Sequence, residues 1–307
     1  MKAKAPRNKT LELSASDTAR YAAQALKLSR PAAVEEIRDQ IILQDAMKAL
    51  DFLPDKCVNL MIADPPYNLT KNFGKSTFRE MDAEAYKTWL DQWLQKTIRL
   101  LKDNASVYIC SDWKTSLVIP EIAGKYLLLQ NRISWEREKG RGALNNWKNC
   151  LEDIWFFTKS KDYTFNLDAV KIQRKVIAPY RNADGQPKDW VEGKEHKFRL
   201  TSPSNIWTDI SIPFWSMPEN TPHPTQKPEK LMAKLILASS NAGDLVFDPF
   251  VGSGTTAVTA KKLGRRYLGI EREKEYAALA LKRLELAETN KEIQGFEDGV
   301  FKARQGV

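Results

Sequence analysis

The sequence is poor in the residues that build metal centres and disulfide frameworks. Its 307 residues include two histidines, His196 and His223, and three cysteines, Cys57, Cys110 and Cys150. The cysteines are odd in number and have no CxxC spacing, so they indicate neither a paired framework nor a zinc site, and they fit a reducing compartment. We therefore expect no metal.

Long apolar runs are also missing from the sequence. No stretch approaches the roughly 18 consecutive apolar residues of a transmembrane helix, and the basic N-terminal residues lack the apolar core of a signal peptide. We therefore expect a soluble protein that is not exported and has no membrane partner.

The sequence does contain enough apolar residues for a core, together with an excess of positive charge. Hydrophobic residues make up 42% of the chain, which suffices for one α/β catalytic domain with an inserted module. The formal net charge is +9. Because lysines and arginines on phosphates release counterions, this balance favours a polyanionic partner.

The most informative motif is Asp64-Pro65-Pro66-Tyr67, which directly follows the apolar run 58–63. A short continuous apolar run is typical of a strand that is buried on both faces in a parallel sheet, and ligands of such sheets bind beyond the carboxyl ends of the strands. The motif therefore predicts a site with a carboxylate and an aromatic ring. Taken alone, it fits an ordinary strand-to-loop turn equally well, because proline fixes φ and cannot pair within a sheet.

A second strand-end loop lies at residues 245–256, where LVFDPFVGSGTT predicts a strand, a glycine loop and a helix start. Gly252 and Gly254 permit a tight turn and close approach to a ligand, and Thr255 can cap the helix. The third glycine of a dinucleotide fingerprint is missing, so pyrophosphate binding is the weaker interpretation. The next predicted strand ends in Glu271, which can accept hydrogen bonds from a ribose. This predicts a nucleoside site, the alternative being a structural turn beside a solvated glutamate.

Three motifs in a fixed order carry a family resemblance: DPPY at 64–67, HPTQKP at 223–228 and DPFVGSGTT at 248–256. From about residue 40 to 288 the chain resembles the β-class of S-adenosylmethionine-dependent DNA amino-methyltransferases. The resemblance implies an α/β fold, with a doubly wound, mostly parallel, seven-stranded Rossmann-like sheet and motifs in circularly permuted order. It also implies an inserted target-recognition region.

The resemblance implies S-adenosyl-L-methionine as cofactor and S-adenosyl-L-homocysteine as product. Lys227, with Thr225 and Gln226, is then placed to bind the methionyl carboxylate, the alternative being a proline-bounded loop and helix start. Asp45 is placed near the adenine or sulfonium, although an N-cap role is equally supported. The other cofactor-binding candidates are His223, Asp248, Phe250, Gly252, Ser253, Gly254, Thr255 and Glu271.

The four residues Asp64, Pro65, Pro66 and Tyr67 form the predicted catalytic set. An exocyclic amine is a poor nucleophile because its lone pair is delocalised into the ring. Asp64 and the Pro65 carbonyl offer acceptors for its two N–H groups, which positions the nitrogen for in-line attack on a methyl group. The base must leave the duplex, at a cost of roughly a few kcal/mol, and stacking on Tyr67 can return ~1–3 kcal/mol. The aspartate favours adenine N6, whereas cytosine N4 members more often carry serine there.

The loop 136–148 combines basic residues, amides, glycines and a tryptophan, which suits contact with DNA; a mobile surface loop is the alternative. Its DNA-binding candidates are Lys139, Arg141, Asn145, Asn146 and Lys148. By resemblance, target recognition lies within residues 161–220. The expected partner is double-stranded DNA, in a cytoplasmic, nucleoid-associated protein. Family habit alone suggests a homodimer and a cognate restriction endonuclease.

Local patterns predict several elements around these motifs. Two short helical patterns lie within residues 21–38, and a helix with a buried aromatic stripe precedes a strand over residues 86–110. Pro228 is expected to open a helix. The resemblance further implies that the strands that end in Asp64 and Asp248 lie side by side, so that methyl donor and acceptor meet.

These expectations divide the chain into five segments. They are an N-terminal helical appendage (1–39), a catalytic half (40–160), a target-recognition region (161–220), a cofactor-binding half (221–290) and a C-terminal tail (291–307). The predicted function is site-specific methylation of the N6 amine of a flipped adenine. Methylation of cytosine N4, of RNA or of a protein amide, and a non-catalytic DNA-binding module, are the alternatives.

Overall fold

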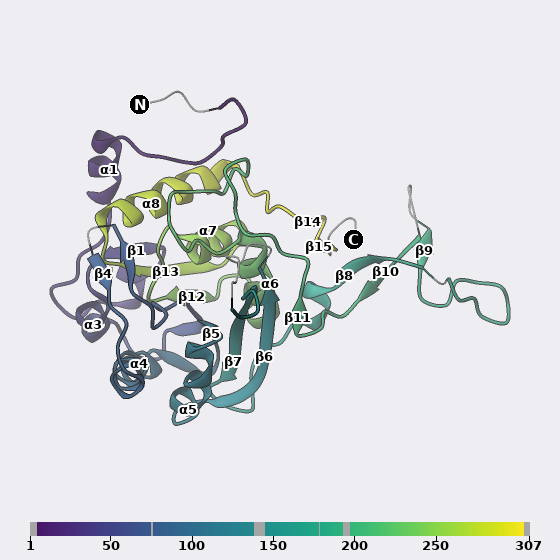
Figure 1. The fold of residues 1–307 in the computed structure, drawn as a ribbon, viewed down its shortest axis with the longest axis horizontal. Coiled ribbons are helices and arrows are strands. Elements are labelled where there is room, and N and C mark those ends of the chain that lie inside the picture. Colours follow the sequence, from purple (N-terminus) through teal and green to yellow (C-terminus); the bar gives the residue numbers. More distant parts are fainter. Residues whose placement is uncertain (1–4, 75, 138–144, 178, 193–196, 304–307) are drawn as a thin grey trace.

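The computed structural model describes residues 5–74, 76–137, 145–177, 179–192 and 197–303, which fold around an eight-stranded sheet (Figure 1). In spatial order its strands are β1 (Gln40–Leu43), β13 (Arg266–Glu271), β12 (Leu245–Asp248), β2 (Val58–Ala63), β5 (Leu101–Asp112), β7 (Leu151–Thr158), β6 (Leu128–Glu136) and β11 (Ile206–Trp207). Only β7 runs antiparallel to its neighbours. The mostly parallel, doubly wound sheet is confirmed, with the two-residue β11 as an eighth strand beyond the seven expected.

Helices cover both faces of this sheet, as the doubly wound prediction requires. One face packs on α3 (Ala46–Ala49), α4 (Ala83–Ile98) and α5 (Ile119–Ala123), and the other on α6 (Glu229–Ser239), α7 (Thr255–Lys262) and α8 (Lys274–Thr289). Short 3-10 turns occupy η1 (Leu50–Phe52), η2 (Thr115–Leu117) and η3 (Leu167–Val170). No described helix is both long and apolar enough to cross a bilayer.

The apolar run before Asp64 is continuous because both faces of β2 are covered. Met61 and Ala63 join the hydrophobic cluster with α4, whereas Leu60 and Ile62 point into the cluster with α6 and α7. Successive side chains of a strand alternate between faces, so over residues 60–63 each cluster takes every second residue. β2 pairs in parallel with β12 through Leu60 and Met61, which confirms that the two motif-bearing strands are neighbours.

Helix α4 carries the predicted aromatic stripe. Its N-cap Asp82 accepts a hydrogen bond from the Ala85 amide at 2.8 Å. Tyr86 and Trp93 are buried, as expected for core residues, and the stripe ends as β5 begins at Leu101. α6 begins directly after Pro228, as predicted.

The N-terminal appendage contains α1 (Ala15–Ala22) and α2 (Val34–Ile37). α1 begins earlier than the predicted pattern because the Ser14 hydroxyl accepts the Asp17 amide at 3.1 Å and caps the helix. Tyr21 and Ala22 pack on Ala278 of α8, so the appendage covers the outer side of that helix.

A second, five-stranded sheet brings the predicted recognition region and the C-terminal tail together. Its order is β14 (Phe296–Glu297), β15 (Val300–Lys302), β8 (Ile172–Lys175), β10 (Lys197–Thr201) and β9 (Val191–Glu192). β15 pairs in parallel with β8, and Phe301 is fully buried there. The strands β8 and β10 extend away from the large sheet (Figure 1).

The start of α7 differs from the prediction in one respect. Gly254, with φ +87°, is the N-cap, and Thr255 is the first helical residue, so Thr255 does not cap the helix. A Cβ at position 254 would lie 2.6 Å from the Ala280 Cβ. The glycine is therefore required both by its left-handed backbone and by the close approach of α8.

We predict that Gly254→Ala destabilises the protein more than Gly243→Ala. Gly243 has a similar φ of +82°, but no described atom lies within 4 Å of its added Cβ. Both substitutions incur about 1–2 kcal/mol of backbone strain, and the clash at position 254 adds a further ~1–3 kcal/mol. Urea unfolding of the two variants measures the difference, and equal losses would contradict the close helix contact.

Candidate active site

A cavity of about 340 Å³ opens at the carboxyl ends of the central strands, where the site was expected. The predicted residues that line it are Asp45 after β1, Asp64, Pro65, Pro66 and Tyr67 after β2, Phe250 and Gly252 after β12, Glu271 at the end of β13, and His223 and Thr225 from the loop before α6. The parallel sheet therefore gathers both strand-end motifs around one cavity.

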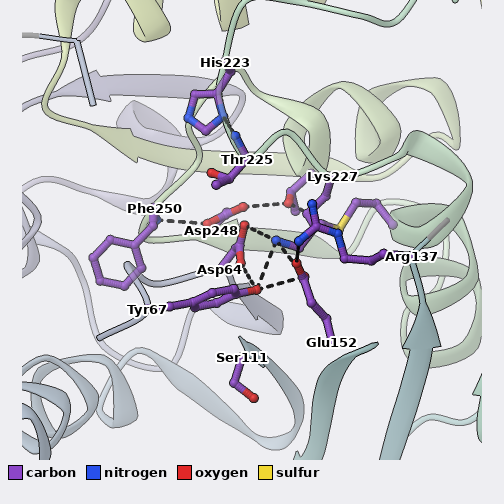
Figure 2. Close-up of polar contacts among 12 residues, drawn as sticks. Asp64, Tyr67, Ser111, Arg137, Glu152, His223, Thr225, Lys227, Asp248 and Phe250 are labelled. Atoms are coloured by element: carbon purple, nitrogen blue, oxygen red, sulfur yellow. Dashed lines mark hydrogen bonds and ion pairs between the residues drawn. The ribbon is translucent and has the colours of Figure 1, made fainter. Parts of the chain in front are cut away.

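A buried cluster of charges surrounds Asp64 in this cavity (Figure 2). Lys227 Nζ lies 2.6 Å from Asp64 Oδ2 and 3.3 Å from Glu152 Oε2. The Tyr67 hydroxyl lies 2.9 Å from Asp64 Oδ1 and 3.0 Å from Glu152 Oε2, so its one proton can be donated to either carboxylate. Arg137 binds the other Glu152 oxygen at 2.5 Å.

Burial and neighbouring charges act in opposite directions on these groups. Burial raises the pKa of Asp64, with Glu152 adding to the rise and Lys227 opposing it. Burial also favours the neutral forms of Glu152 and Lys227. The cations around Glu152 nevertheless hold its pKa below the usual value, and the two carboxylates hold the pKa of Lys227 above its usual value. Asp64 is therefore the carboxylate of the cluster that protonates more readily.

The DPPY segment is fixed from the side of α4. The Tyr86 hydroxyl donates a hydrogen bond to the Pro66 carbonyl at 3.1 Å. The side-chain NH₂ of Asn68 donates a hydrogen bond to the Met81 carbonyl at 2.9 Å. The side-chain oxygen of Asn68 accepts a hydrogen bond from the Met81 backbone N–H at 2.8 Å. These contacts hold the chain after β2 in one position beside the cavity.

Two further buried carboxylates lie at the ends of β13 and β12. Glu271 accepts the Glu273 amide at 2.7 Å, and burial raises its pKa to about 7. Asp248 accepts the Phe250 amide at 2.9 Å and the Thr256 hydroxyl at 2.6 Å, and burial likewise raises its pKa to about 7. Glu271 lines the cavity, whereas Asp248 shapes the turn into the glycine loop.

His223 supports the glycine loop from behind. A Cβ at Gly252, whose φ is +54°, would lie 2.9 Å from the His223 Nε2. The imidazole packs edge-on against Tyr276, with ring centroids 4.4 Å apart. Burial lowers the pKa of His223 to about 3, so the ring is neutral at physiological pH.

Three predicted cofactor-binding residues face other parts of the protein. The Gln226 side chain accepts the Thr221 amide at 2.9 Å and donates to the Glu219 carbonyl at 2.6 Å, which braces the loop before α6. The Ser253 carbonyl and the Thr255 hydroxyl accept hydrogen bonds from Arg283 of α8 at 2.9 Å and 3.0 Å.

The remaining predicted residues separate into two groups. Asp45 occupies the N-cap position of α3, but its side chain makes no capping hydrogen bond. The residue lines the cavity. Asn145, Asn146 and Lys148 are exposed, while Lys139 and Arg141 lie outside the described residues. No group of three or more metal-ligating side chains occurs within the described ranges.

The structure adds residues that the motifs did not indicate. The hairpin of β3 (Lys71–Phe73) and β4 (Ser76–Phe78) forms one wall of the cavity, and the Gly74 amide donates to the Tyr276 hydroxyl at 3.1 Å. Three-residue strands are too short for a periodic signal. Glu152 lies on β7 and Arg137 directly follows β6. Neither residue belongs to a sequence motif, so the sequence gives no signal that they join the site.

The sequence is similar to that of known DNA methyltransferases. The family model of the N6/N4 methyltransferases, described as DNA methylase, matches residues 58–282. The chain is 35% identical over 261 residues to the Type II methyltransferase M.HpaI of Haemophilus parainfluenzae, covering 84% of this chain and 76% of the relative. It is 35% identical over 254 residues to the DNA adenine methyltransferase YhdJ of Escherichia coli, covering 80% and 83%.

Solved structures show the same fold. The M1.HpyAVI complex with SAM superposes with a TM-score of 0.51 at 23% identity, covering 80% of this chain and 98% of that one. The cytosine-N4-specific PvuII DNA methyltransferase has a TM-score of 0.58 at 17% identity, covering 83% and 87%.

We predict that Lys227→Met lowers the free energy of unfolding by about 3–5 kcal/mol, because two buried carboxylates lose their shared cation. The folded-state pKa values of Asp64 and Glu152 would rise, and protonation at low pH would relieve the repulsion. The loss in free energy of unfolding should therefore be largest at pH 8 and become smaller towards pH 5.

Denaturant unfolding at the two pH values checks this prediction. Lys56→Met is the control, because Lys56 pairs with Asp103 at an exposed position and its loss should leave stability near that of the wild type. A deficit for Lys227→Met that is the same at pH 5 and pH 8 would contradict the assignment.

Proposed function

The chain belongs to the N6/N4 family of DNA methylases, and we propose that it methylates the N6 amine of an adenine flipped out of double-stranded DNA. It is an S-adenosylmethionine-dependent DNA methyltransferase. The observation that carries the adenine proposal is the Asp64 carboxylate beside the Pro65 carbonyl, at one end of a cavity that has Glu271 at the other. The relative YhdJ, named a DNA adenine methyltransferase, supports the same base.

The residues of the cavity fit S-adenosylmethionine. Glu271 offers a buried carboxylate for a ribose, and Gly252 leaves room for close approach. Phe250 packs against Trp93 with ring centroids 5.2 Å apart and supplies an apolar wall suited to an adenine ring. Because Lys227 is engaged by Asp64, we assign the methionyl carboxylate to Thr225 and Lys71, which both line the cavity.

The protein groups prepare the amine for attack. When bound, the cofactor supplies a methyl group activated by a positively charged sulfur. Asp64 and the Pro65 carbonyl accept the two N–H groups of the target amine, which orients the nitrogen lone pair. Tyr67 offers its ring to the flipped base. After transfer the nitrogen must lose a proton, and Asp64, whose pKa is raised by burial, is placed to accept it.

DNA contact is proposed for the loop between β6 and β7, whose described residues 145–149 are exposed. Trp147 is 93% exposed, and Asn145, Asn146 and Lys148 are exposed around it. Amides and a lysine suit base edges and phosphates, and an exposed indole suits stacking. The names of M.HpaI and M.BglII as Type II methyltransferases support a cognate endonuclease as a further partner. A homodimer is also proposed, on family habit alone.

The second candidate function is methylation of cytosine N4. The matching family includes both chemistries, and cytosine also presents an exocyclic amine that Asp64 can bind. The two functions differ only in the base that fills the pocket. Chemical identification of the methylated base therefore separates them.

We expect the purified protein to methylate adenine at one recurring sequence in unmodified genomic DNA, as read by single-molecule sequencing after incubation with S-adenosylmethionine. Asp64→Asn, which replaces an acceptor oxygen by an NH₂ donor, should abolish transfer while leaving cofactor affinity within about threefold, because uniform binding is retained. N4-methylcytosine would replace the adenine proposal. Full activity of Asp64→Asn would contradict the catalytic assignment.

We also predict that affinity for S-adenosylhomocysteine falls about tenfold between pH 8 and pH 6, because a carboxyl group with a pKa of about 7 offers two charged acceptor oxygens to a ribose only when it is ionised. Glu271→Gln should bind more weakly at pH 8 and lose this pH dependence. His223 stays neutral across this range, and Asp248, whose pKa is also about 7, does not line the cavity, so neither group contributes. Titration calorimetry measures the dissociation constants of the wild type and of Glu271→Gln at the two pH values. A pH dependence that is retained in Glu271→Gln would contradict the role of Glu271.

A further inference from the structure

Glu152 lies in the catalytic cluster although it belongs to none of the sequence motifs. It stands on β7, in register with Asp112 of β5 and Trp135 of β6, and is 4% exposed. Its carboxylate contacts the same two groups that hold Asp64, namely Lys227 and the Tyr67 hydroxyl. Glu152 and Asp64 therefore share one cation and one hydroxyl proton (Figure 2).

The shared partners present a problem for catalysis. Asp64 Oδ2 is bound by Lys227 at 2.6 Å, and Asp64 Oδ1 is within reach of the Tyr67 hydroxyl at 2.9 Å. Each oxygen can still accept a second hydrogen bond, but a carboxylate whose charge is already neutralised by an ammonium and a hydroxyl is a weaker acceptor for the N–H of a neutral amine. An ammonium buried with a single carboxylate would hold it strongly, because attraction between opposite charges grows as water is removed.

Glu152 supplies the alternative acceptor. The Tyr67 hydroxyl proton can turn from Asp64 Oδ1 to Glu152 Oε2 without any proton transfer, since both oxygens lie within hydrogen-bond distance. Lys227 likewise has a second carboxylate at 3.3 Å. Arg137 balances the extra negative charge, so two cations face two carboxylates in the cluster.

We propose that Glu152 is a positioning residue for methyl transfer: it draws Lys227 and the Tyr67 hydroxyl away from Asp64 so that Asp64 can accept the target amine. This inference rests on the proposed function. It assigns Glu152 no contact with the reacting atoms. Its effect is to set how strongly Asp64 is held before the base arrives.

The charge of Glu152 should be visible in the titration of Asp64. Titratable groups from several elements surround Asp64. They are Lys227 from the loop before α6, Glu152 from β7, Tyr67 beside Asp64, Tyr86 from α4, Cys110 from β5, Asp248 from β12 and Lys71 from β3, and Arg137 after β6 pairs with Glu152. Glu152 raises the pKa of Asp64 by like charge, whereas Lys227 lowers it. Removing the Glu152 charge should therefore lower the pKa of Asp64.

The test compares Glu152→Gln with Asp153→Asn on the same strand. Glutamine keeps the size of the side chain and an acceptor oxygen but removes its charge. Asp153 points to the opposite face of the sheet, where it accepts hydrogen bonds from Ser116 and Ser134 at 2.6 Å and 2.9 Å. Asp153→Asn therefore controls for a charge loss on β7 that does not reach Asp64.

We expect single-turnover methylation by Glu152→Gln to be slower by about tenfold or more, with cofactor and DNA dissociation constants within about twofold of the wild type. The acid limb of its pH–rate profile should shift to lower pH. Glu152→Asp, which retains the charge, should recover part of the rate, and Asp153→Asn should leave the acid limb in place. An unchanged rate and profile in Glu152→Gln, or a loss that appears equally in binding with no shift of the acid limb, would overturn the inference.

A second measurement separates this inference from the proposed function. Titration of ¹³C-labelled aspartate carboxyl carbons by NMR reports the pKa of Asp64 without any substrate. We expect a lower value in Glu152→Gln than in the wild type, with Asp64→Asn identifying the resonance. An unchanged Asp64 pKa overturns the inference even if DNA is methylated. A failure of the wild type to methylate DNA, with the pKa shift present, counts against the proposed function alone.

Discussion

The buried ammonium of Lys227 is the interaction on which the rest of the site depends. It lies between Asp64 and Glu152, and so joins the end of β2, the start of β7 and the loop that leads into α6. An unpaired charge in such a place costs several kcal/mol, so each partner is tolerated only because the others are present. The Asp64 carboxylate is therefore held by a network drawn from three separate segments of the chain.

The sheet makes this network possible by placing strand ends together. β2 and β12 are neighbours, which puts Asp64 near the glycine loop and allows one cavity to serve both a base and a cofactor. The carboxylates of the cavity then differ by environment. Glu152 is kept ionised by two cations, whereas burial raises the pKa of Glu271 to about 7. The same chemical group thereby serves as a charge partner at one end and as a candidate ribose acceptor at the other.

Local strain is concentrated where the cofactor is expected. Gly252 and Gly254 both have positive φ, and any side chain there would meet His223 or Ala280. Buried polar groups from α8 and the loop before α6 support this turn, with Arg283 binding Ser253 and Thr255. Positive φ angles and buried polar groups are expected at a functional site when they keep donor and acceptor atoms close to a ligand.

The sequence alone determined the α/β class, the strand before Asp64, the glycine loop before α7 and the neighbouring positions of β2 and β12. The first three follow from local apolar runs, glycines and prolines, whereas the neighbouring positions of β2 and β12 follow from the family resemblance that the motifs carry. The tertiary structure alone decided that Lys227 binds Asp64, that Gln226 faces its own loop, that Glu152 joins the cluster, and that β15 pairs with β8. The physical reason is that periodicity tells which face of a strand is buried, whereas the partner of a long side chain depends on which segments the fold brings within a few ångströms of it.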